Sequence, residues 1–311
     1  DQLSHMKRRN IRVLLPCPRP APAAVWGEHY YGVSLGRALA RAGLGGTLDY
    51  FRDSRTGLGT RRWPYSSEID LLIWCGRDRA RKRGRKLILW VLWGAEMLSD
   101  EMCAAAEHIF VASKGFADDL AARGWPASFL PQCSDTTLFS PRAPIPSLAS
   151  DVLFVGNTGA TSPPRPAAAE ALKVGLDLSV WGVGWEGHIP NSIIRGTWVA
   201  NEDLANVYAS ANVVLNDHNA SMVTQGFASN RVFDVLASGV PLVSDRIKAE
   251  SGLDPDLSAL IQMFDPGGIL DAVERARLLT ARQISEGARL VAARHSFDNR
   301  VAEIVSVLGL R

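Results

Sequence analysis

The sequence predicts an α/β protein made of two doubly wound, Rossmann-like domains that face each other across a cleft. Short apolar runs alternate with amphipathic helical segments along the chain, which is typical of parallel sheets covered by helices. The 311 residues suit two domains of about 150 residues, each large enough to bury its own core. A proline-rich stretch at residues 140–146 marks the junction between them.

The first half of the chain, residues 9–140, is predicted to form the N-terminal domain. Its apolar runs are short and bounded by polar residues or glycine, as buried parallel strands should be. A helix begins near Gly27 and ends at Gly43. The predicted strands cover residues 11–15, 48–51, 71–75, 87–92 and 109–112. Residues 1 to about 8 are set aside, because Ser-His-Met at 4–6 is typical of a cloning remnant.

The second half repeats the pattern over residues 147–290. Strands are predicted at 152–155, 176–181, 213–215, 241–243 and 261–264, and helices at about 166–174, 202–210, 230–238 and 267–287. A last helix, at about 297–309 within segment 291–311, carries an apolar stripe and must pack against another element. Two such domains predict a binding crevice at the carboxyl ends of their strands.

Composition limits the classes of protein that the chain can belong to. A net charge of +2 does not by itself indicate nucleic-acid binding. The four cysteines lack CxxC spacing, which favours a reducing compartment and argues against a structural zinc site. There is no secretory signal and no apolar run near 18 residues. We therefore expect a cytoplasmic protein without a transmembrane segment.

Residues 230–245 form the most informative segment. The pattern predicts a helix that starts at Asn230 and Arg231, ends at Gly239 and leads into a strand. An arginine beside the free N–H groups of a helix N-terminus can bind phosphate. Asp234 lies one turn later on the same face, within reach of the vicinal hydroxyls of a ribose. An ordinary amphipathic helix with an asparagine cap and a solvated arginine is the alternative.

This segment resembles the signature of group 1 glycosyltransferases, and most closely that of the CgeB-like branch. Further phrases resemble that family in the same order: Trp-Gly-Glu at 26–28, Ser-Asp-Thr-Thr-Leu-Phe-Ser-Pro at 134–141, Phe-Val-Gly-Asn at 154–157, Leu-Asn-Asp-His at 215–218 and Ser-Phe-Asp-Asn-Arg at 296–300. The resemblance covers nearly the whole chain. It implies a GT-B fold, with the acceptor in the first domain, a nucleotide sugar in the second, and a terminal helix that crosses back to the first.

The chain departs from the family pattern at two positions of the donor region. The family usually has Glu where this chain has Asp234, and many relatives have a second Glu where this chain has Gly226, next to Gln225. The second departure leaves open whether transfer inverts or retains the configuration of the sugar.

A glycine-containing loop after the strand at 152–155 is a candidate diphosphate site. Gly156 and Asn157 begin the loop, and Arg165 ends it. Small residues let backbone amides approach a diphosphate, and Arg165 could neutralise its charge. A flexible linker with a surface arginine is the alternative. Two cations at the diphosphate would explain why such an enzyme needs no metal ion, and no Asp-x-Asp motif stands at a strand-to-loop junction. We expect no cofactor beyond the donor substrate.

Residues 182–187 fit the GxGxxG pattern, but a dinucleotide site is rejected. His188-Ile-Pro190 follows where a helix should start. We expect this loop to lie near the donor instead, with Trp185 as part of its wall. Asp217 and His218, after the strand at 213–215, are further candidates for the cleft.

Candidates for general acid–base catalysis are few. An inverting transfer needs a base near the acceptor hydroxyl. Glu28 and His29 sit at the first strand-to-helix turn of the first domain, which faces the cleft in this architecture. The alternative for Glu28 is an acidic residue that stabilises the first turn of a helix.

Residues 77–86, from Arg77 to Lys86, contain seven basic residues in ten. Nucleic acid, an anionic lipid surface or an anionic glycan acceptor could account for them, and a solvated loop is the alternative. The acceptor, whether glycan, lipid-linked molecule or small molecule, is not specified by the sequence. Two other functions compete with sugar transfer: a nucleotide-sugar 2-epimerase and a non-catalytic nucleotide-sugar-binding protein.

Overall fold

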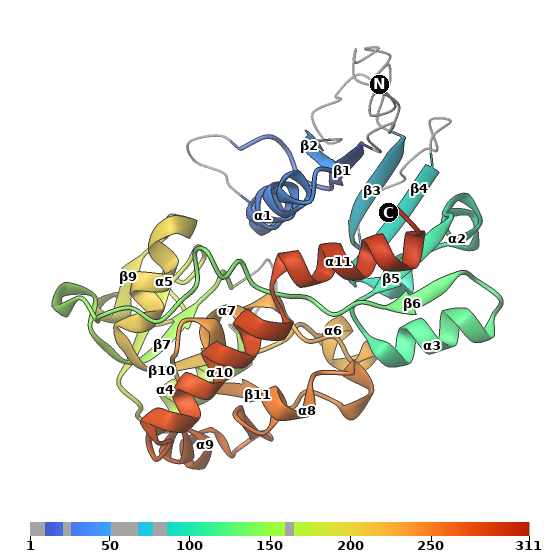
Figure 1. Cartoon of the computed structure of the whole chain (residues 1–311). Helices are drawn as coiled ribbons and strands as arrows, with labels where there is room; N and C mark the ends of the chain where they lie inside the picture. Colours follow the sequence, from blue (N-terminus) through green and yellow to red (C-terminus); the bar gives the residue numbers. More distant parts are fainter. Residues whose placement is uncertain (1–9, 21–25, 51–67, 77–85, 159–164, 311) are drawn as a thin grey trace.

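The computed structural model describes residues 10–20, 26–50, 68–76, 86–158 and 165–310. They form two α/β domains, each built on a six-stranded parallel sheet (Figure 1). The strand orders are β2-β1-β3-β4-β5-β6 and β12-β11-β10-β7-β8-β9, so both sheets are doubly wound. The fold class predicted from the sequence is confirmed.

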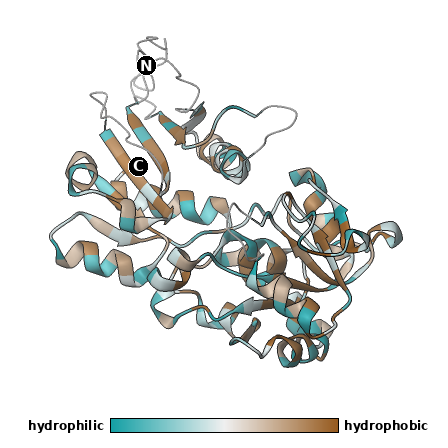
Figure 2. Cartoon of the chain, turned by 180° about the vertical axis from the view of Figure 1, so that it is seen from behind, coloured by the Kyte–Doolittle hydropathy of each residue, from teal (hydrophilic) through white to brown (hydrophobic). Residues whose placement is uncertain are grey.

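The first sheet is the core of the N-terminal domain, and every residue of β3 is buried. Its strands are β1 (Ile11–Leu15), β2 (Gly45–Tyr50), β3 (Ile69–Cys75), β4 (Lys86–Trp93), β5 (His108–Val111) and β6 (Ala127–Phe129). The helices are α1 (Gly27–Arg41), the 3-10 turn η2 (Ala95–Met97), α2 (Asp100–Ala105) and α3 (Lys114–Ala122). The hydropathy view shows mostly hydrophobic strands and helices in which hydrophobic and hydrophilic residues are mixed (Figure 2).

The second sheet consists of β7 (Ser150–Val155), β8 (Leu178–Trp181), β9 (Ile194–Gly196), β10 (Ala211–Asn216), β11 (Leu242–Asp245) and β12 (Gln262–Phe264). Its helices are α4 (Pro166–Lys173), α5 (Asn201–Ala209), α6 (Ala220–Gln225), α7 (Asn230–Ala237), α8 (Pro255–Ser258), α9 (Ile269–Arg277) and α10 (Ala281–Arg294), with 3-10 turns η3 (Pro146–Leu148), η4 (Asn191–Ile193) and η5 (Ala249–Ser251).

One predicted helix is wrong. The segment 267–287 was expected to be continuous, but it divides into α9 and α10. Thr280 starts the second helix with a capping box: its hydroxyl accepts from the backbone N–H of Gln283, whose side chain accepts from the backbone N–H of Thr280. Because a capping box satisfies donors that only a helix start leaves free, it defines a new N-terminus here.

The terminal helix α11 (Phe297–Leu308) packs on the first domain (Figure 1). Phe297, Val301 and Ile304 belong to the hydrophobic core of that domain, and the ring of Phe297 meets the ring of Tyr31 edge-on at 4.8 Å. Met222 of α6 and the nearby Phe227 enter the same core. The two domains are therefore joined by packed apolar side chains as well as by the chain itself.

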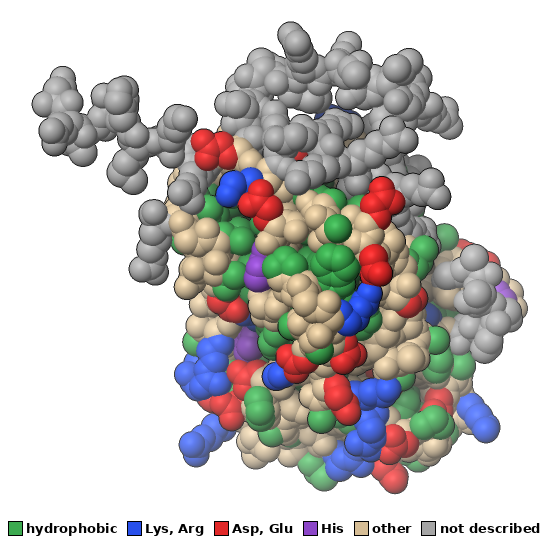
Figure 3. Space-filling model, turned by 90° about the vertical axis from the view of Figure 1, so that its right-hand side faces the viewer, with side chains coloured by type: hydrophobic (Ala, Val, Ile, Leu, Met, Phe, Trp, Pro, Cys, Tyr) green, Lys and Arg blue, Asp and Glu red, His purple; other side chains and the backbone are tan. Residues whose placement is uncertain are grey.

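Charges on the described surface are mixed. On the face drawn in Figure 3, Lys and Arg side chains alternate with Asp and Glu, and neither sign gathers over a large area. Residues 77–85 of the basic run lie outside the described residues; Lys86 is described, and its amine pairs with Glu107 at 3.1 Å. Among the described helices, none is both long and apolar enough to cross a bilayer.

Candidate active site in the interdomain cleft

A cavity of about 260 Å³ lies between α1 and the carboxyl-end loops of the second sheet. Its lining comes from both domains and from the segment that joins them. Gly27, Tyr30, Tyr31, Ser34, Cys133, Asp135 and Phe297 line it on one side, and Gly156, Asn157, Trp181, Trp198, Tyr208, Asn230, Arg231 and Asp234 are among the residues on the other. The position matches the crevice that two doubly wound domains predict.

The N-terminus of α7 points its first residues at this cavity. Asn230 and Arg231 both line it, and Ser229, at the N-cap, makes no side-chain capping hydrogen bond. Uncapped N–H groups at a helix N-terminus attract anions, and an adjacent arginine adds a full positive charge. This end of the cavity can therefore hold a phosphate or diphosphate.

Arg231 is fixed in direction by buried neighbours. Its Nη1 donates to Oδ1 of Asn216 at 2.8 Å, and its guanidinium carbon lies 5.4 Å from the centre of the Phe154 ring. Burial lowers the pKa of Arg231, and the side chain remains a cation because the ordinary pKa of arginine is so high. A side chain at Gly156 would place Cβ only 3.0 Å from the guanidinium, so glycine there leaves room for the arginine.

Asn216 was not predicted as a site residue, yet it organises this end of the cavity. It is fully buried at the end of β10, its Oδ1 accepts from both Arg231 and Ser229, and its Nδ2 donates to Ser244 at 2.9 Å. Two signals in the sequence pointed to it: a polar residue directly after the apolar run 213–215, and its place in the family-like phrase at 215–218. An amide is suited to the position because it donates and accepts at once.

Asp234 lines the cavity one turn below Arg231, and its side chain is held on both oxygens. Oδ1 accepts from the hydroxyl of Ser134 at 2.7 Å, and Oδ2 accepts from Nδ2 of Asn230 at 3.0 Å. Burial raises the pKa of Asp234 to about 7, against the opposing effect of these hydrogen bonds and of Arg231. Each carboxylate oxygen has a second lone pair, so the group can still accept from a ligand hydroxyl.

Two loops of the second sheet are linked to each other at the cavity wall. The backbone N–H of Gly156 donates to Trp181 at 2.8 Å, and Oδ1 of Asn157 accepts from the backbone N–H of Val183 at 2.8 Å. Gly156 and Asn157 line the cavity as predicted, whereas residues 159–164 of the same loop lie outside the described residues.

Trp185 does not form the wall that the sequence predicted. Its side chain is fully buried behind the loop, where it meets Phe154 edge-on and donates from Nε1 to the carbonyl of Gly156 at 2.8 Å. Trp185 therefore supports the loop from the protein interior. The tryptophans that line the cavity are instead Trp181 and Trp198.

Arg165 and Asp217 were predicted as separate donor-binding residues, but they pair with each other. Nε of Arg165 donates to Oδ1 of Asp217 at 2.7 Å, and Oδ2 of Asp217 accepts from the first-turn N–H of Ala167 in α4. The carboxylate thus fixes the arginine and caps the helix at once. The guanidinium carbon of Arg165 also lies 5.4 Å from the centre of the Phe154 ring, and Arg165 does not line the cavity.

His218 is buried and structural. Its Nε2 accepts from the backbone N–H of Ser229 at 3.0 Å, so its Nδ1 carries the proton and donates to Asp245 at 2.6 Å. This fixes the turn that leads into α7.

The first domain does not bring the predicted acid–base pair into the cavity. Gly27, Tyr30, Tyr31 and Ser34 form the face of α1 that lines it, and at 100° per residue Glu28 and His29 lie on other faces. His29 contacts the hydroxyl of Tyr50 at 2.8 Å, and burial lowers its pKa. Tyr31 was missed because it shares the i, i+4 spacing of the core residues Leu35 and Leu39.

The two carboxylates with Asp-x-Asp spacing are engaged in ion pairs. Asp254 and Asp256 have Asp-x-Asp spacing, but both pair with Arg294, and Asp254 also pairs with His295. Within the described ranges, no three His, Cys, Asp or Glu side chains come together to hold a metal ion. Metal independence stays a prediction.

Solved structures with the same two-domain arrangement identify the fold. An α-glucosyltransferase solved with UDP and a 13-mer DNA matches with a TM-score of 0.67 and 12% identity, over 96% of this chain and 99% of that one. The fold is GT-B. AviGT4, a glycosyltransferase of avilamycin A biosynthesis, shows the same GT-B arrangement with a TM-score of 0.60 and 16% identity over 96% of both chains.

A family model described as "Glycosyl transferase-like" matches residues 165–306, most of the second GT-B domain and α11. This match supports sugar transfer, the activity predicted from the sequence. A putative UDP-N-acetylglucosamine 2-epimerase from Listeria monocytogenes also shares the fold, with a TM-score of 0.54 and 11% identity over 97% of this chain and 96% of that one. A comparison with curated proteins found no match.

Proposed function

We propose that the protein transfers a sugar from a nucleoside-diphosphate sugar to an acceptor bound on the side of the first domain. The observation that carries this proposal is the second-domain wall of the cavity, where the N-terminus of α7, Arg231 and Gly156 converge one turn above a buried carboxylate, Asp234. A diphosphate at the N-terminus of α7 would leave the ribose of the same nucleotide on the side of Asp234.

The diphosphate binds at the open N-terminus of α7, with Arg231 as its direct cation. When the sugar departs, negative charge grows on the leaving phosphate, and a cation already fixed in place stabilises that charge without reorganisation. Arg165 lies near the same Phe154 ring and is held by Asp217. No divalent ion is needed in this scheme.

The carboxylate of Asp234 accepts hydrogen bonds from the ribose hydroxyls. Its shorter side chain, relative to the glutamate of the family that the sequence resembles, is compensated by its position directly on the cavity wall. The aromatic side chains of Trp181 and Trp198 give the base and the sugar flat surfaces to pack on.

Gly226 stands where many relatives of the resembled family have their second glutamate, so this chain has no carboxylate at that position. This residue ends α6 with φ of 68°, a conformation that glycine adopts far more easily than glutamate. The sequence resemblance supports two further parts of the proposal, an acceptor site in the first domain and membership of the CgeB-like branch. Composition supports a cytoplasmic location and a contact between the basic residues 77–86 and an anionic partner.

The test uses donors labelled in the sugar, screened with UDP-, GDP-, ADP- and dTDP-sugars and a panel of glycan, lipid-linked and small-molecule acceptors, with and without EDTA. We expect free nucleotide and a labelled acceptor, with turnover preserved in EDTA. An isomerised sugar would identify an epimerase, and tight binding without turnover a sensor. Loss of activity in EDTA that manganese or magnesium restores would contradict the metal-independent scheme.

A further inference from the structure

The two connections between the domains meet at one point beside the donor site. The first connection leaves β6 through residues 130–149, and the second joins α10 to α11. The backbone N–H of Ser134, in the first, donates to the carbonyl of His295 at 3.0 Å, and Ser134 forms a parallel bridge with Ser296 in the second. The crossing strands are therefore held together at Ser134.

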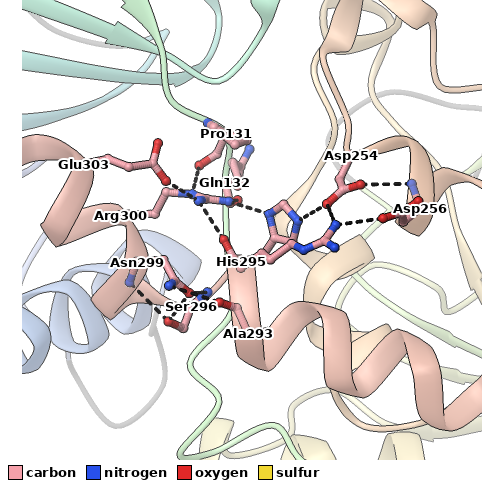
Figure 4. Close-up of polar contacts among 11 residues, drawn as sticks. Pro131, Gln132, Asp254, Asp256, Ala293, His295, Ser296, Asn299, Arg300 and Glu303 are labelled. Carbon is pink, nitrogen blue, oxygen red and sulfur yellow. Dashed lines mark hydrogen bonds and ion pairs between the residues drawn. The ribbon is translucent and has the colours of Figure 1, made fainter.

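Arg300 of α11 binds residues of both connections at this crossing (Figure 4). Its side chain is buried, and it donates to the carbonyls of Pro131 at 2.8 Å and Gln132 at 3.2 Å. It also donates to Nδ1 of His295 at 2.7 Å, because a guanidinium can only donate. The ring therefore carries its proton on Nε2 and donates to Asp254 at 2.9 Å. These contacts join the first domain, the crossing and the second domain.

Ser134 extends from this rigid crossing into the donor site. Its hydroxyl donates to Oδ1 of Asp234 at 2.7 Å, while its backbone stays bonded to His295. Ser134 has no exposed surface and is not part of the cavity lining, so its side chain acts on a ligand only through Asp234.

We propose that Ser134 is a positioning residue that ties the nucleotide-binding carboxylate of Asp234 to the crossing between the domains. It holds the carboxylate in the orientation that accepts ribose hydroxyls and favours its ionised form by donating to it. Donor affinity is thereby linked to the arrangement of the two domains, since the hydrogen bond exists only while the crossing keeps its place. This inference rests on the donor site proposed above.

The charge of Asp234 depends on groups from three sides. Arg231 on α7 favours the ionised carboxylate, whereas Asp135 on the first connection disfavours it; Cys133 on the same connection and Tyr208 on α5 also face it. Removing the hydroxyl of Ser134 leaves these groups unchanged and takes away one hydrogen bond to the charged form. The pKa of Asp234 should then rise.

The experiment measures binding by calorimetry from pH 5.5 to 8.5, using the tightest binder among UDP, GDP, ADP and dTDP as the probe. Ser134→Ala should raise Kd about 10-fold at pH 7, as expected for one hydrogen bond to a charged group. The midpoint of the loss of affinity on the acid side should move to higher pH. Ser134→Thr, which keeps the hydroxyl, should restore both.

Ser238→Ala is the matched control, because the buried Ser238 hydroxyl donates to the backbone carbonyl of Asp234 and not to its carboxylate. We expect it to bind as the unmodified protein does. The inference would be overturned if Ser134→Ala had the same affinity and the same midpoint as the unmodified protein. It would also be overturned if Ser134→Ala and Ser238→Ala lost the same affinity without a shift in midpoint. Failure of the unmodified protein to bind any of the four nucleotides would instead overturn the donor site itself, and the inference with it.

Discussion

The two walls of the cavity are built on different principles. The second-domain wall carries two charged groups that are each held by a buried polar residue: Arg231 by Asn216, and Asp234 by Ser134. The first-domain wall is one face of α1, with two tyrosines, a serine and a glycine. A nucleotide always presents the same phosphates and ribose, so a fixed constellation suits it. Acceptors differ, and an aromatic surface with few polar contacts suits that variety.

The largest expected effect is a difference in stability between alanine variants of two tryptophans of the second domain. Trp185→Ala should lower the free energy of unfolding by about 3–5 kcal/mol, because it empties a fully buried site behind Gly156. Trp198→Ala, at a side chain that is 56% exposed, should leave the melting temperature nearly unchanged and weaken ligand binding. Thermal unfolding of both variants tests this. Comparable melting temperatures would mean that Trp185 is not the support of the loop.

A second comparison concerns the two arginines beside Phe154. Arg231→Ala should weaken binding of the nucleoside diphosphate by about 1.5–3 kcal/mol, the usual loss for a hydrogen bond to a charged group. Arg165→Ala should cost less affinity, since Arg165 already pairs with Asp217 and does not line the cavity. Calorimetry at constant ionic strength measures both. A larger loss of affinity for Arg165→Ala than for Arg231→Ala would place the diphosphate at Arg165.

The third prediction uses the raised pKa of Asp234. In the folded protein this pKa is about 7, above its ordinary value of 3.8, so the folded state holds the proton more tightly than the unfolded state does. The associated stability is present below pH 4 and is lost as the pH rises through 7. Between pH 5.5 and 8, the melting temperature of the ligand-free protein should therefore fall further than that of Asp234→Asn. The difference should be about 2–4 °C for each kcal/mol of unfolding free energy that Asp234 contributes.

Asp234→Asn should at the same time weaken binding of a ribonucleotide more than that of its 2′-deoxy analogue. The amide cannot accept the hydroxyl hydrogen bonds as the carboxylate does. Equal losses for the two nucleotides would show that Asp234 does not contact the 2′-hydroxyl.

The smallest expected effect is on the first-domain wall. Glu28→Gln should change turnover less than about threefold, because Glu28 lies off the face of α1 that lines the cavity, whereas loss of a general base costs at least about 100-fold. His29→Ala is the companion variant. A 100-fold loss in either, with donor affinity kept, would restore that residue as the base.

Sequence patterns predicted the elements with a clear apolar run or stripe and missed others, among them the nine-residue helix α3. The strands at 11–15 and 71–75 stood out because whole apolar runs are bounded by polar residues, and α7 and α11 stood out through their apolar stripes. The three-residue β6 and the six-residue α2 are too short for any period to emerge.

The site shows the same limit at the level of side chains. Asn230, Arg231 and Asp234 could be placed from helical spacing, because neighbours on one turn stay neighbours in space. Arg165 and Asp217 are 52 residues apart, and nothing in a single sequence indicates that they pair. Trp185 shows that a residue can belong to the right loop while its side chain faces the interior.

The packing of α11 on the first domain has a consequence for the order of folding on the ribosome. Phe297, Val301 and Ile304 complete a core whose first-domain members emerge long before them, so part of that core stays uncovered while the second domain is synthesised. Newly made chains with such exposed surface are prone to association. The first domain therefore reaches its full stability only after the second domain and α11 have been made.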